Sequence, residues 1–324
     1  MDLSIIFVNW NSKAFLQNCL KSVYQHCAEF SFEIIVVENA TYDGCGDMLA
    51  AEFKNVTFVQ SSTNLGFGGA NNLGARLASG RNLLFLNPDT LLLDNSLRQL
   101  CTALDSLPNA GVVGCRLVSG NHAVQTSCIQ SSPTVLNQVL DSDFLRETFP
   151  RSTLWGTEAL LQTNSPSMVE AISGACLMVK RKEFERVGGF TEEYFMYGED
   201  LDLCFKIMKS GRARYFVPDV SIIHYGGTST RKAGSDFSQV MMRASVQRFL
   251  ELNRGLGLAR LYRISMAVTS LVRLFCIMLL IPLSSDRLIR HGSDSLRKWL
   301  AIFRWSIGWQ PRSIDVAALR CAKA

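Results

Sequence analysis

Two short acidic stretches carry the residues best suited to chemistry. Residues 198–204 read Gly-Glu-Asp-Leu-Asp-Leu-Cys and follow an aromatic run at 194–197, while Asp89 closes an apolar run far upstream. A carboxylate can hold Mg²⁺ or Mn²⁺ against a diphosphate, and another can deprotonate an alcohol. We therefore expect the two stretches to serve one reaction, one as metal ligand and the other as general base.

The downstream stretch crowds Glu199, Asp200 and Asp202 into four residues. Mutual repulsion and partial burial should raise the pKa of at least one carboxyl toward the range useful to a general base. Acidic residues also favour the first turn of a helix, here expected at 201–210, for ordinary dipole reasons. Both readings hold if Asp200 faces a cleft and Asp202 serves the helix.

The upstream stretch is Asn87-Pro88-Asp89-Thr90, in which Asp89 would hold the metal and Asn87 would add a neutral oxygen. The alternative is a turn with Asp89 capping a helix. His224 follows the apolar residues 220–223 and precedes Tyr225-Gly226-Gly227, so its imidazole could complete the metal shell when that loop closes. A lone histidine is otherwise a structural residue.

A glycine-rich turn, Asn64-Leu65-Gly66-Phe67-Gly68-Gly69-Ala70-Asn71-Asn72, leads into a helical pattern. Its backbone can approach a diphosphate closely, and amides at a helix start favour negative charge. Such turns also occur without any ligand, so the motif alone is weak.

Apolar, β-branched runs alternate with helical patterns and predict an α/β fold with a mostly parallel sheet. The expected strands are 3–8, 33–37, 56–60 and 82–86, and the expected helices are 14–25, 47–53 and 69–78. In such sheets ligands bind beyond the carboxyl ends of the strands. The polar residues expected there are Asn9, Asn11, Glu38, Asn39, Asn64, Asn87 and Asp89.

Further elements are expected at 96–107 (helix), 111–118, 168–172 and 176–179 (strands), 181–187 and 201–210 (helices) and 215–217 (strand). Residues 120–168 have no sustained period and predict an irregular insertion. The chain divides into a catalytic region, 1–237, and a helical tail, 238–324.

The tail carries 14 basic and 4 acidic residues, a net of +10, whereas residues 1–237 carry −5. Because the basic residues are spaced among apolar ones, this favours an anionic membrane surface over nucleic acid. Arg273 interrupts the apolar stretch 264–283 and leaves 274–285 as an uncharged run, which is short for a spanning helix, so we expect an interfacial helix. Packing of that helix on the catalytic region is the alternative.

The ten cysteines lack close pairing and lie mostly in apolar runs, as with Cys101, Cys115, Cys176, Cys204 and Cys276, which indicates buried thiols in a reducing compartment. Their spacing implies no zinc site. The N-terminus enters a strand-like run at once, which is not the pattern of a secretory signal peptide. The expected location is cytoplasmic, peripheral on the cytoplasmic face of the inner membrane. The oligomeric state is left open.

Taken together, these motifs resemble the family 2 glycosyltransferases, especially their bacterial rhamnosyltransferase-like branch, over about residues 1–230. Beyond the stretches above, the resemblance rests on 7–12 (Phe-Val-Asn-Trp-Asn-Ser), 36–39 (Val-Val-Glu-Asn) with Asp43-Gly44, 174–178 (Gly-Ala-Cys-Leu-Met) and 188–190 (Gly-Gly-Phe). The order and number of these motifs make the match specific.

The resemblance implies a GT-A fold, a Rossmann-like sheet flanked by helices, and transfer of a sugar with inversion from a nucleotide diphosphate donor. It places Asp89 as the metal-binding acid, Asp200 with Glu199 at the general base, and His224 as a further metal ligand. Donor contacts fall on Asn9, Asn11, Glu38, Asn64, Gly66, Asn71 and Asn87. Asn87 replaces the first acid of the family's DxD motif, and Glu38 stands where Asp is commoner.

The expected donor is dTDP-rhamnose, with UDP-sugars as the alternative, and the expected acceptor is a lipid-linked saccharide of cell-envelope or O-antigen synthesis. A nucleotidyltransferase would carry a basic glycine-rich loop after its first strand, where this chain has Asn9-Trp10-Asn11-Ser12. A processive synthase would add spanning helices and a Gln-x-x-Arg-Trp motif. An inactive membrane scaffold is the non-enzymatic alternative.

Overall fold

The N-terminal half of the computed structural model alternates strands and helices as the apolar periodicity predicts. The model describes residues 1–27, 30–161, 165–226, 235–280 and 286–309. The elements are β1 (Leu3–Asn9), α1 (Lys13–His26), β2 (Phe32–Asn39), α2 (Cys45–Glu52), β3 (Val56–Ser61), α3 (Gly66–Leu77) and β4 (Asn82–Leu86). Each lies within three residues of its predicted bounds.

The second half of the sheet region contains shorter elements. They are β5 (Thr90–Leu91), α4 (Ser96–Ser106), β6 (Ala110–Val118), η1 (Thr126–Cys128), β7 (Ile129–Gln130), α5 (Val135–Val139), α6 (Asp143–Thr148), α7 (Glu158–Leu161), β8 (Ser167–Met168), β9 (Ala171–Ile172), β10 (Cys176–Lys180), α8 (Arg181–Arg186), α9 (Glu199–Lys209) and β11 (Ala213–His224). The insertion at 120–168 is therefore irregular, but it contains short helices that the sequence period did not reveal.

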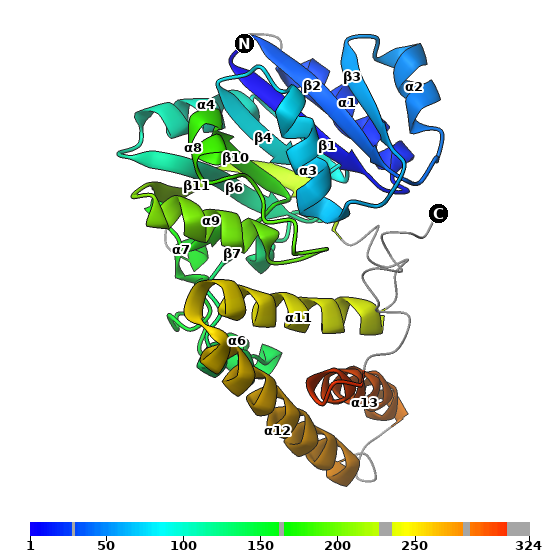
Figure 1. The fold of residues 1–324 in the computed structure, drawn as a ribbon, viewed down its shortest axis with the longest axis vertical. Coiled ribbons are helices and arrows are strands. Elements are labelled where there is room, and N and C mark those ends of the chain that lie inside the picture. Colours follow the sequence, from blue (N-terminus) through cyan, green and yellow to red (C-terminus); the bar gives the residue numbers. More distant parts are fainter. Residues whose placement is uncertain (28–29, 162–164, 227–234, 281–285, 310–324) are drawn as a thin grey trace.

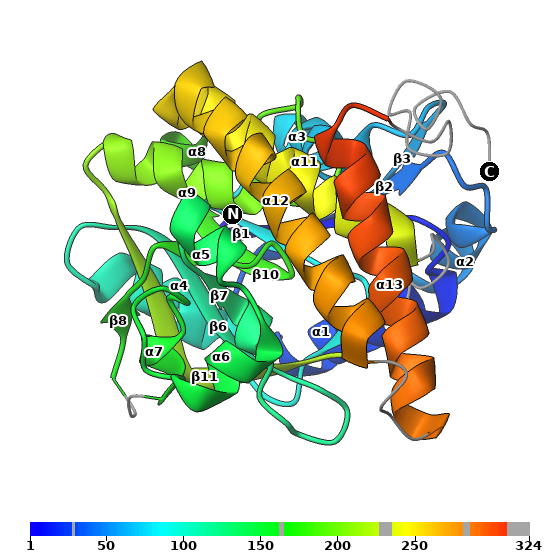
Figure 2. The ribbon, with the colours of Figure 1, turned by 90° about the horizontal axis from the view of Figure 1, so that it is seen from below.

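One large sheet has the strand order β3-β2-β1-β4-β10-β6-β11-β5, with β8 pairing β11. β1 to β4 are parallel, and β6 and β11 are parallel, whereas β10 runs antiparallel between β4 and β6. Helices α3 and α9 lie on one face and α1 and α4 on the other (Figures 1 and 2). Because both faces are covered, the central strands are almost wholly buried. The predicted mostly parallel sheet is confirmed.

The end of β11 is bent back to the upstream acidic stretch. Its register with β6 shifts between Val217 and Ser221, and its last residues then pair antiparallel with β5, His224 opposite Thr90. The backbone N–H of Tyr225 donates to the carbonyl of Asp89 at 2.9 Å. This register places two motifs separated by more than 130 residues side by side. Gly227, part of the predicted closing loop, lies outside the described residues.

Three long helices follow: α11 (Ser235–Arg254), α12 (Leu256–Leu280) and α13 (Asp286–Ser306). α11 lies between the sheet region and the other two (Figure 1). It packs on α9 through Phe249, whose ring meets Phe205 edge to face at 5.3 Å. It also contacts the aromatic run at 194–197 through Ser245, whose Oγ donates to the carbonyl of Met196. Residues 281–285 and 310–324 of the predicted tail lie outside the described part.

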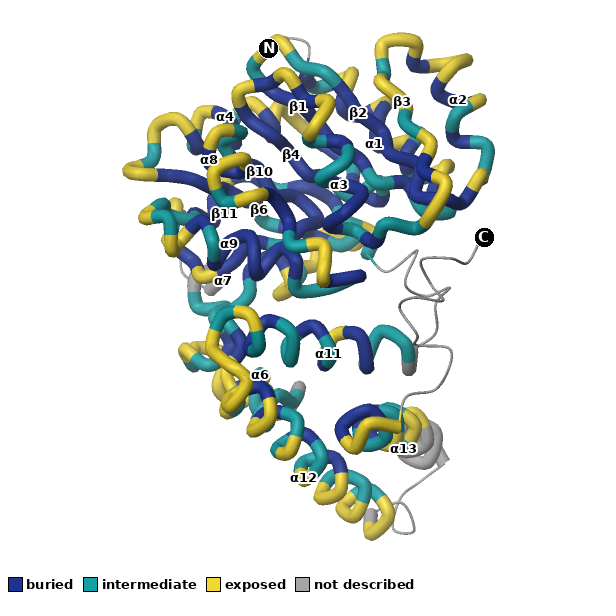
Figure 3. Tube along the Cα trace, viewed as in Figure 1, coloured by how far each residue is buried: buried dark blue, intermediate teal, exposed yellow. Residues whose placement is uncertain are grey.

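α12 has two unlike faces (Figure 3). Ala259, Tyr262, Met266 and Ser270 are buried toward the neighbouring helices. The exposed face is a stripe of apolar side chains at helical spacing, which we call the α12 stripe. It consists of Leu261, Ile264, Val268, Leu271, Val272, Phe275, Met278 and Leu279.

The charged residues within α12 lie mainly on its inner side. Arg263 donates to the carbonyls of Trp305 and Ser306, and Arg273 donates to those of Val139 and Asp141. Within the described residues, Leu256–Leu279 is the one stretch long and apolar enough to cross a membrane by length and composition, and only 22% of its apolar window is buried. The uncharged run from 274 is thus part of a longer apolar helix that includes Arg273, and the expected interfacial position of this helix stays a prediction. Cys276, expected to be buried, is exposed on this helix.

Candidate active site

A cavity of about 810 Å³ lies beyond the carboxyl ends of the parallel strands, bounded on one side by α11. It brings together most of the residues predicted from the two acidic stretches and the glycine-rich turn. These are Asn64, Gly66, Asn87, Asp89, Glu199, Asp200 and His224. Asp89 and Asp200 thus face one space, as the sequence predicted.

Asp200, at the start of α9, is buried and held by three donors. Its Oδ2 accepts from the backbone N–H of Gly174 at 2.9 Å and from Nε2 of Gln130 at 3.1 Å, and its Oδ1 accepts from the backbone N–H of Leu201 at 2.8 Å. Burial raises the pKa of the Asp200 carboxyl, while these hydrogen bonds favour its ionised form. The result is a fixed carboxylate with one edge toward the cavity.

The neighbouring Glu199 differs from Asp200 in its hydrogen bonding and its pKa. It is 5% exposed, and its Oε2 meets no hydrogen-bond partner among the described residues. Burial, and then the charge of Asp200, raise the pKa of Glu199 to about 8. This favours a protonated Glu199 at neutral pH, while the three N–H donors favour an ionised Asp200. The predicted rise of a carboxyl pKa applies to both residues.

Asp202, in contrast, serves the structure. Its Oδ2 accepts from Thr191 Oγ1 at 2.6 Å and lies 3.5 Å from Nζ of Lys206, and its Oδ1 accepts from Asn253 of α11 at 2.8 Å. It joins the loop before α9, α9 itself and α11. The division of roles expected between Asp200 and Asp202 matches this geometry.

The glycine-rich turn is locked to the aromatic loop. Gly66 has φ +72°, and a Cβ at this position would lie 2.3 Å from the carbonyl oxygen of Phe195, so no other residue fits without a shift. The next backbone N–H, of Phe67, donates to that same carbonyl. Asn64 Oδ1 accepts from Gly66 N–H and from Asn39 Nδ2, which fixes the turn from the β2 side. Both asparagines line the cavity.

At the other acidic stretch, Asp89 lies beside His224. Nε2 of His224 is 3.4 Å from Oδ1 of Asp89 and 3.4 Å from the amide nitrogen of Asn87. Nδ1 of His224 is 2.8 Å from Oε1 of Gln125, a contact that favours the proton on Nδ1 and leaves the Nε2 lone pair toward Asp89.

An imidazole and a carboxylate oriented in this way fit a divalent cation that also takes diphosphate oxygens as ligands. Asn87, expected to supply an oxygen, instead turns its amide nitrogen toward His224. The fit therefore rests on Asp89 and His224.

Asn9 and Glu38 form a buried network behind the cavity wall. Nδ2 of Asn9 donates to both Glu38 and Asp43, and Glu38 also accepts from the backbone and hydroxyl of Thr41. Neither Asn9 nor Glu38 lines the cavity; nor does Asn11, nor Asn71, whose Nδ2 donates within α3 to the Phe67 carbonyl. Four predicted donor contacts are thus placed next to the cavity rather than on it.

The ligand atoms of Glu38, Asp43 and Cys45 lie within 4.8 Å of one another, the geometry of a possible metal triad. The oxygens of both carboxylates already accept hydrogen bonds, Asp43 from Lys13 N–H and Cys45 N–H at 3.0 Å each. Burial and the nearby Glu38 raise the pKa of the Cys45 thiol, which disfavours the thiolate form that binds metals. Asp89 and His224 therefore suit a divalent cation better than this triad does.

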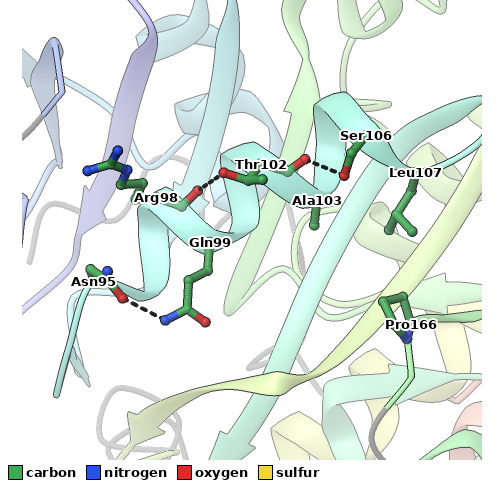
Figure 4. Close-up of a pocket in the computed structure, with 8 residues that line it drawn as sticks. All are labelled: Asn95, Arg98, Gln99, Thr102, Ala103, Ser106, Leu107 and Pro166. Atoms are coloured by element: carbon green, nitrogen blue, oxygen red, sulfur yellow. Dashed lines mark hydrogen bonds between the residues drawn. The ribbon is translucent and has the colours of Figure 1, made fainter.

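A smaller hollow of about 340 Å³ along α4 has no such chemistry. Its polar side chains are used by the helix itself: Gln99 donates to Asn95, Thr102 to the carbonyl of Arg98, and Ser106 to that of Thr102 (Figure 4).

Two glutamines of the insertion were missed from the sequence. Gln130 holds Asp200 and Gln125 orients His224, and Gln125 also donates to the carbonyl of His224 at 2.6 Å. Gln130 lies on β7, which is paired with β9. No local pattern points to either residue, because each contact joins segments 70 or more residues apart.

The comparisons with known proteins identify the family of the chain. Residues 4–155 match the model for glycosyl transferase family 2, and residues 83–303 match that for glycosyl transferase family group 2. An α/β fold with a strand-end carboxylate and a helix-start carboxylate in one cavity is compatible with a GT-A glycosyltransferase. The chain belongs to the family 2 glycosyltransferases.

Two relatives are rhamnosyltransferases by name. The chain is 28% identical over 242 residues to the N-acetylglucosaminyl-diphospho-decaprenol L-rhamnosyltransferase of Mycobacterium tuberculosis (strain ATCC 25618 / H37Rv), covering 70% of this chain and 77% of the relative. It is 27% identical over 176 residues to rhamnosyltransferase WbbL of Escherichia coli (strain K12), covering 51% and 63%.

Among solved structures, the mannosyltransferase PcManGT from Pyrobaculum calidifontis, in complex with GDP-Man and Mn²⁺, superimposes with a TM-score of 0.54 at 17% identity. The superposition covers 94% of this chain and 87% of that one. At this identity the likeness concerns the fold, and it supports the GT-A architecture.

Proposed function

We propose that this glycosyltransferase transfers a sugar with inversion, using Asp200 as the general base. The observation that carries the proposal is the fixed Asp200 carboxylate, held by three donors and facing the cavity that Asp89 also lines. Asp200 accepts the proton of an acceptor hydroxyl, and the oxygen attacks the anomeric carbon on the face opposite the departing nucleoside diphosphate. A single displacement of this kind inverts the configuration and needs no covalent intermediate.

Asp89 and His224 are the proposed ligands of a divalent cation, Mg²⁺ or Mn²⁺. When bound, such a cation offsets the negative charge that develops on the nucleoside diphosphate as it leaves. Gln125 keeps Nε2 of His224 available, and Glu199, neutral at pH 7, adds no negative charge beside the donor. In this proposal Asp89 serves as the cation ligand and Asp200 as the general base.

The proposed donor is dTDP-rhamnose, with UDP-sugars as the alternative; the names of the two relatives support rhamnose as the sugar. Asn64, Gly66 and Asn39 would meet the donor, and the Asn9–Glu38 network would hold the strand ends behind its base. A melting-temperature panel of dTDP, UDP, GDP and ADP, each with and without Mn²⁺, tests this. We expect the largest rise with dTDP and Mn²⁺ together; a rise that is equal without Mn²⁺ would remove the cation from the account.

The proposed acceptor is a lipid-linked saccharide of cell-envelope or O-antigen synthesis, and the enzyme would meet it at the cytoplasmic face of the inner membrane. The support is the α12 stripe together with the basic tail. The inner face of α12 is bound through Arg263 and Arg273 to α13 and to residues 139–141, so the face that bears the stripe is the one open to lipid. We therefore favour a helix lying in the interface, with the stripe toward the lipid.

Vesicle sedimentation tests the membrane part. Val268 and Phe275 are more than half exposed on the stripe, and burial of one large apolar side chain contributes about 1.5–3 kcal/mol. The double variant Val268→Glu/Phe275→Glu should lose most binding to phosphatidylglycerol–phosphatidylethanolamine vesicles. Leu252→Glu, an equally apolar exposed change on α11, is the control. Unchanged sedimentation of the double variant would mean that the stripe does not meet lipid.

A further inference from the structure

The cavity has a cationic end that the proposed reaction has not used. Arg243 of α11 lines it and is 4% exposed, yet its Nε meets no hydrogen-bond acceptor among the described residues. Arg146 of α6 lines the same cavity, with its guanidinium 5.1 Å from the ring centre of Trp155. A buried guanidinium with an unused donor is costly unless a ligand accepts from it.

One carboxylate faces both arginines. Oδ1 of Asp141 accepts from Nε of Arg146 at 2.7 Å, and its Oδ2 lies 4.0 Å from Nη2 of Arg243. The hydroxyl of Tyr262, which the charges of Arg243 and Asp141 both reach, is also buried without a partner in the described part of the chain. Two cations against one anion leave a net positive charge and unused donors, which suits an anionic ligand group.

The position of this end separates it from the donor side. Asn39 and Asn64 follow β2 and β3, whereas Arg146 belongs to α6, and Figures 1 and 2 show α6 on the opposite side of the molecule from β2 and β3. Arg273 of α12 donates to the carbonyls of Val139 and Asp141, which ties this end of the cavity to the helix that bears the α12 stripe.

We propose that Arg243 and Arg146 form the subsite for the diphosphate of a polyisoprenyl-diphosphate-linked acceptor. The diphosphate accepts from the two guanidinium groups, the sugar hydroxyl extends toward Asp200, and the lipid leads toward the α12 stripe. This proposal rests on the proposed function. It adds the chemical class of the acceptor's lipid diphosphate and the residues that bind it.

Binding without turnover tests the subsite. The probes are farnesyl diphosphate, farnesyl phosphate and farnesol, titrated in the absence of any sugar donor. Wild type should bind farnesyl diphosphate most tightly. Arg243→Gln should weaken that binding by about tenfold to a hundredfold, the range of a hydrogen bond to a charged group, and leave farnesol unchanged. Arg243→Lys keeps the charge but not the forked guanidinium, so its affinity for farnesyl diphosphate should lie between those of wild type and Arg243→Gln.

Arg248→Gln is the matched control, since it removes the same charge from the same helix at a residue that pairs with Glu193 and Glu251 outside the cavity. Melting curves report whether each variant folds. If Arg243→Gln does not fold, the affinity for farnesyl diphosphate is compared between wild type, Arg243→Lys and Arg146→Gln instead. Equal diphosphate affinity in wild type and the Arg243 variants, or no preference of wild type for the diphosphate over farnesol, would overturn the subsite.

A parallel titration with dTDP and Mn²⁺ separates this proposal from the proposed function. Arg243→Gln should bind dTDP as wild type does. A matching loss of dTDP affinity would assign Arg243 to the donor and overturn the acceptor subsite. If wild type bound farnesyl diphosphate but no nucleoside diphosphate, the proposed function would fail while the anion subsite remained.

Discussion

Asp200 and Asp89 line the same cavity, but they have different neighbours. Asp200 is surrounded by N–H donors, from Gly174, Leu201 and Gln130, and lies next to a protonated Glu199. Asp89 lies beside an imidazole whose other nitrogen is held by Gln125. A carboxylate held by donors keeps a fixed direction and can accept a proton, whereas one beside a nitrogen lone pair can form part of a ligand set. Their surroundings support the two different roles that we propose.

The strongest test of this difference is Asp200→Asn. The amide keeps the shape of the side chain but cannot take the proton, so transfer should fall about a hundredfold to ten-thousandfold. Donor affinity should stay near that of wild type, because Asp89 and His224 are untouched. Turnover and nucleoside diphosphate affinity are measured on the same preparation.

Asp202→Asn, two residues along α9, is the matched control. It should lower the melting temperature, because Thr191, Lys206 and Asn253 lose the charge and one of the two acceptor oxygens that they share, while the folded enzyme still turns over. Normal transfer by Asp200→Asn would remove the base assignment.

At the other end, Asp89→Ala should abolish the stabilisation of nucleoside diphosphate binding by Mn²⁺, a loss of about tenfold to a hundredfold in affinity for a cation-dependent ligand. Binding without Mn²⁺ should change little. The measurement is a dTDP titration at several Mn²⁺ concentrations. If Asp89→Ala kept the full Mn²⁺ effect, the cation would have to be bound elsewhere.

A smaller effect should come from the glutamines that hold the two sites. Gln130→Ala removes one of three hydrogen bonds to Asp200 and should lower kcat by about tenfold, since such a bond to a charged group contributes about 1.5–3 kcal/mol. Gln125→Ala should instead weaken the effect of Mn²⁺ on nucleoside diphosphate binding, because Gln125 orients His224. Identical kinetic profiles for the two variants would show that they do not serve different sites.

The mildest expected change concerns Glu199. Because its pKa rises from an ordinary 4.5 to about 8 on folding, the folded state binds the extra proton between these values, and stability falls as pH rises from about 4.5 through 8. Glu199→Gln removes this decline, so its melting temperature should fall less between pH 5 and pH 9 than that of wild type. Glu147→Gln, an exposed change on α6, is the control. A wild-type pH slope retained in Glu199→Gln would contradict a protonated Glu199.

The fold and both acidic sites were open to prediction from the sequence because local patterns encode them. Apolar runs mark β1 to β4, and Asp89 and Asp200 stand where a strand ends and a helix begins. Gln125, Gln130 and Arg243 lie in or beyond a segment without period, and their contacts with the site depend on tertiary packing. The antiparallel β10 was likewise invisible, since a buried apolar run has no direction. The division at 237/238 stays a prediction, although α11 contributes Arg243 and Ser245 to the cavity.

The most direct test of the central claim is a crystal structure with dTDP and Mn²⁺, with the cation located by its anomalous scattering. The account predicts one Mn²⁺ bound by Asp89 and His224 and by the diphosphate, with Asp200 on the far side of the space for the sugar. A cation held by Glu38, Asp43 and Cys45, or a diphosphate bound next to Asp200, would contradict it.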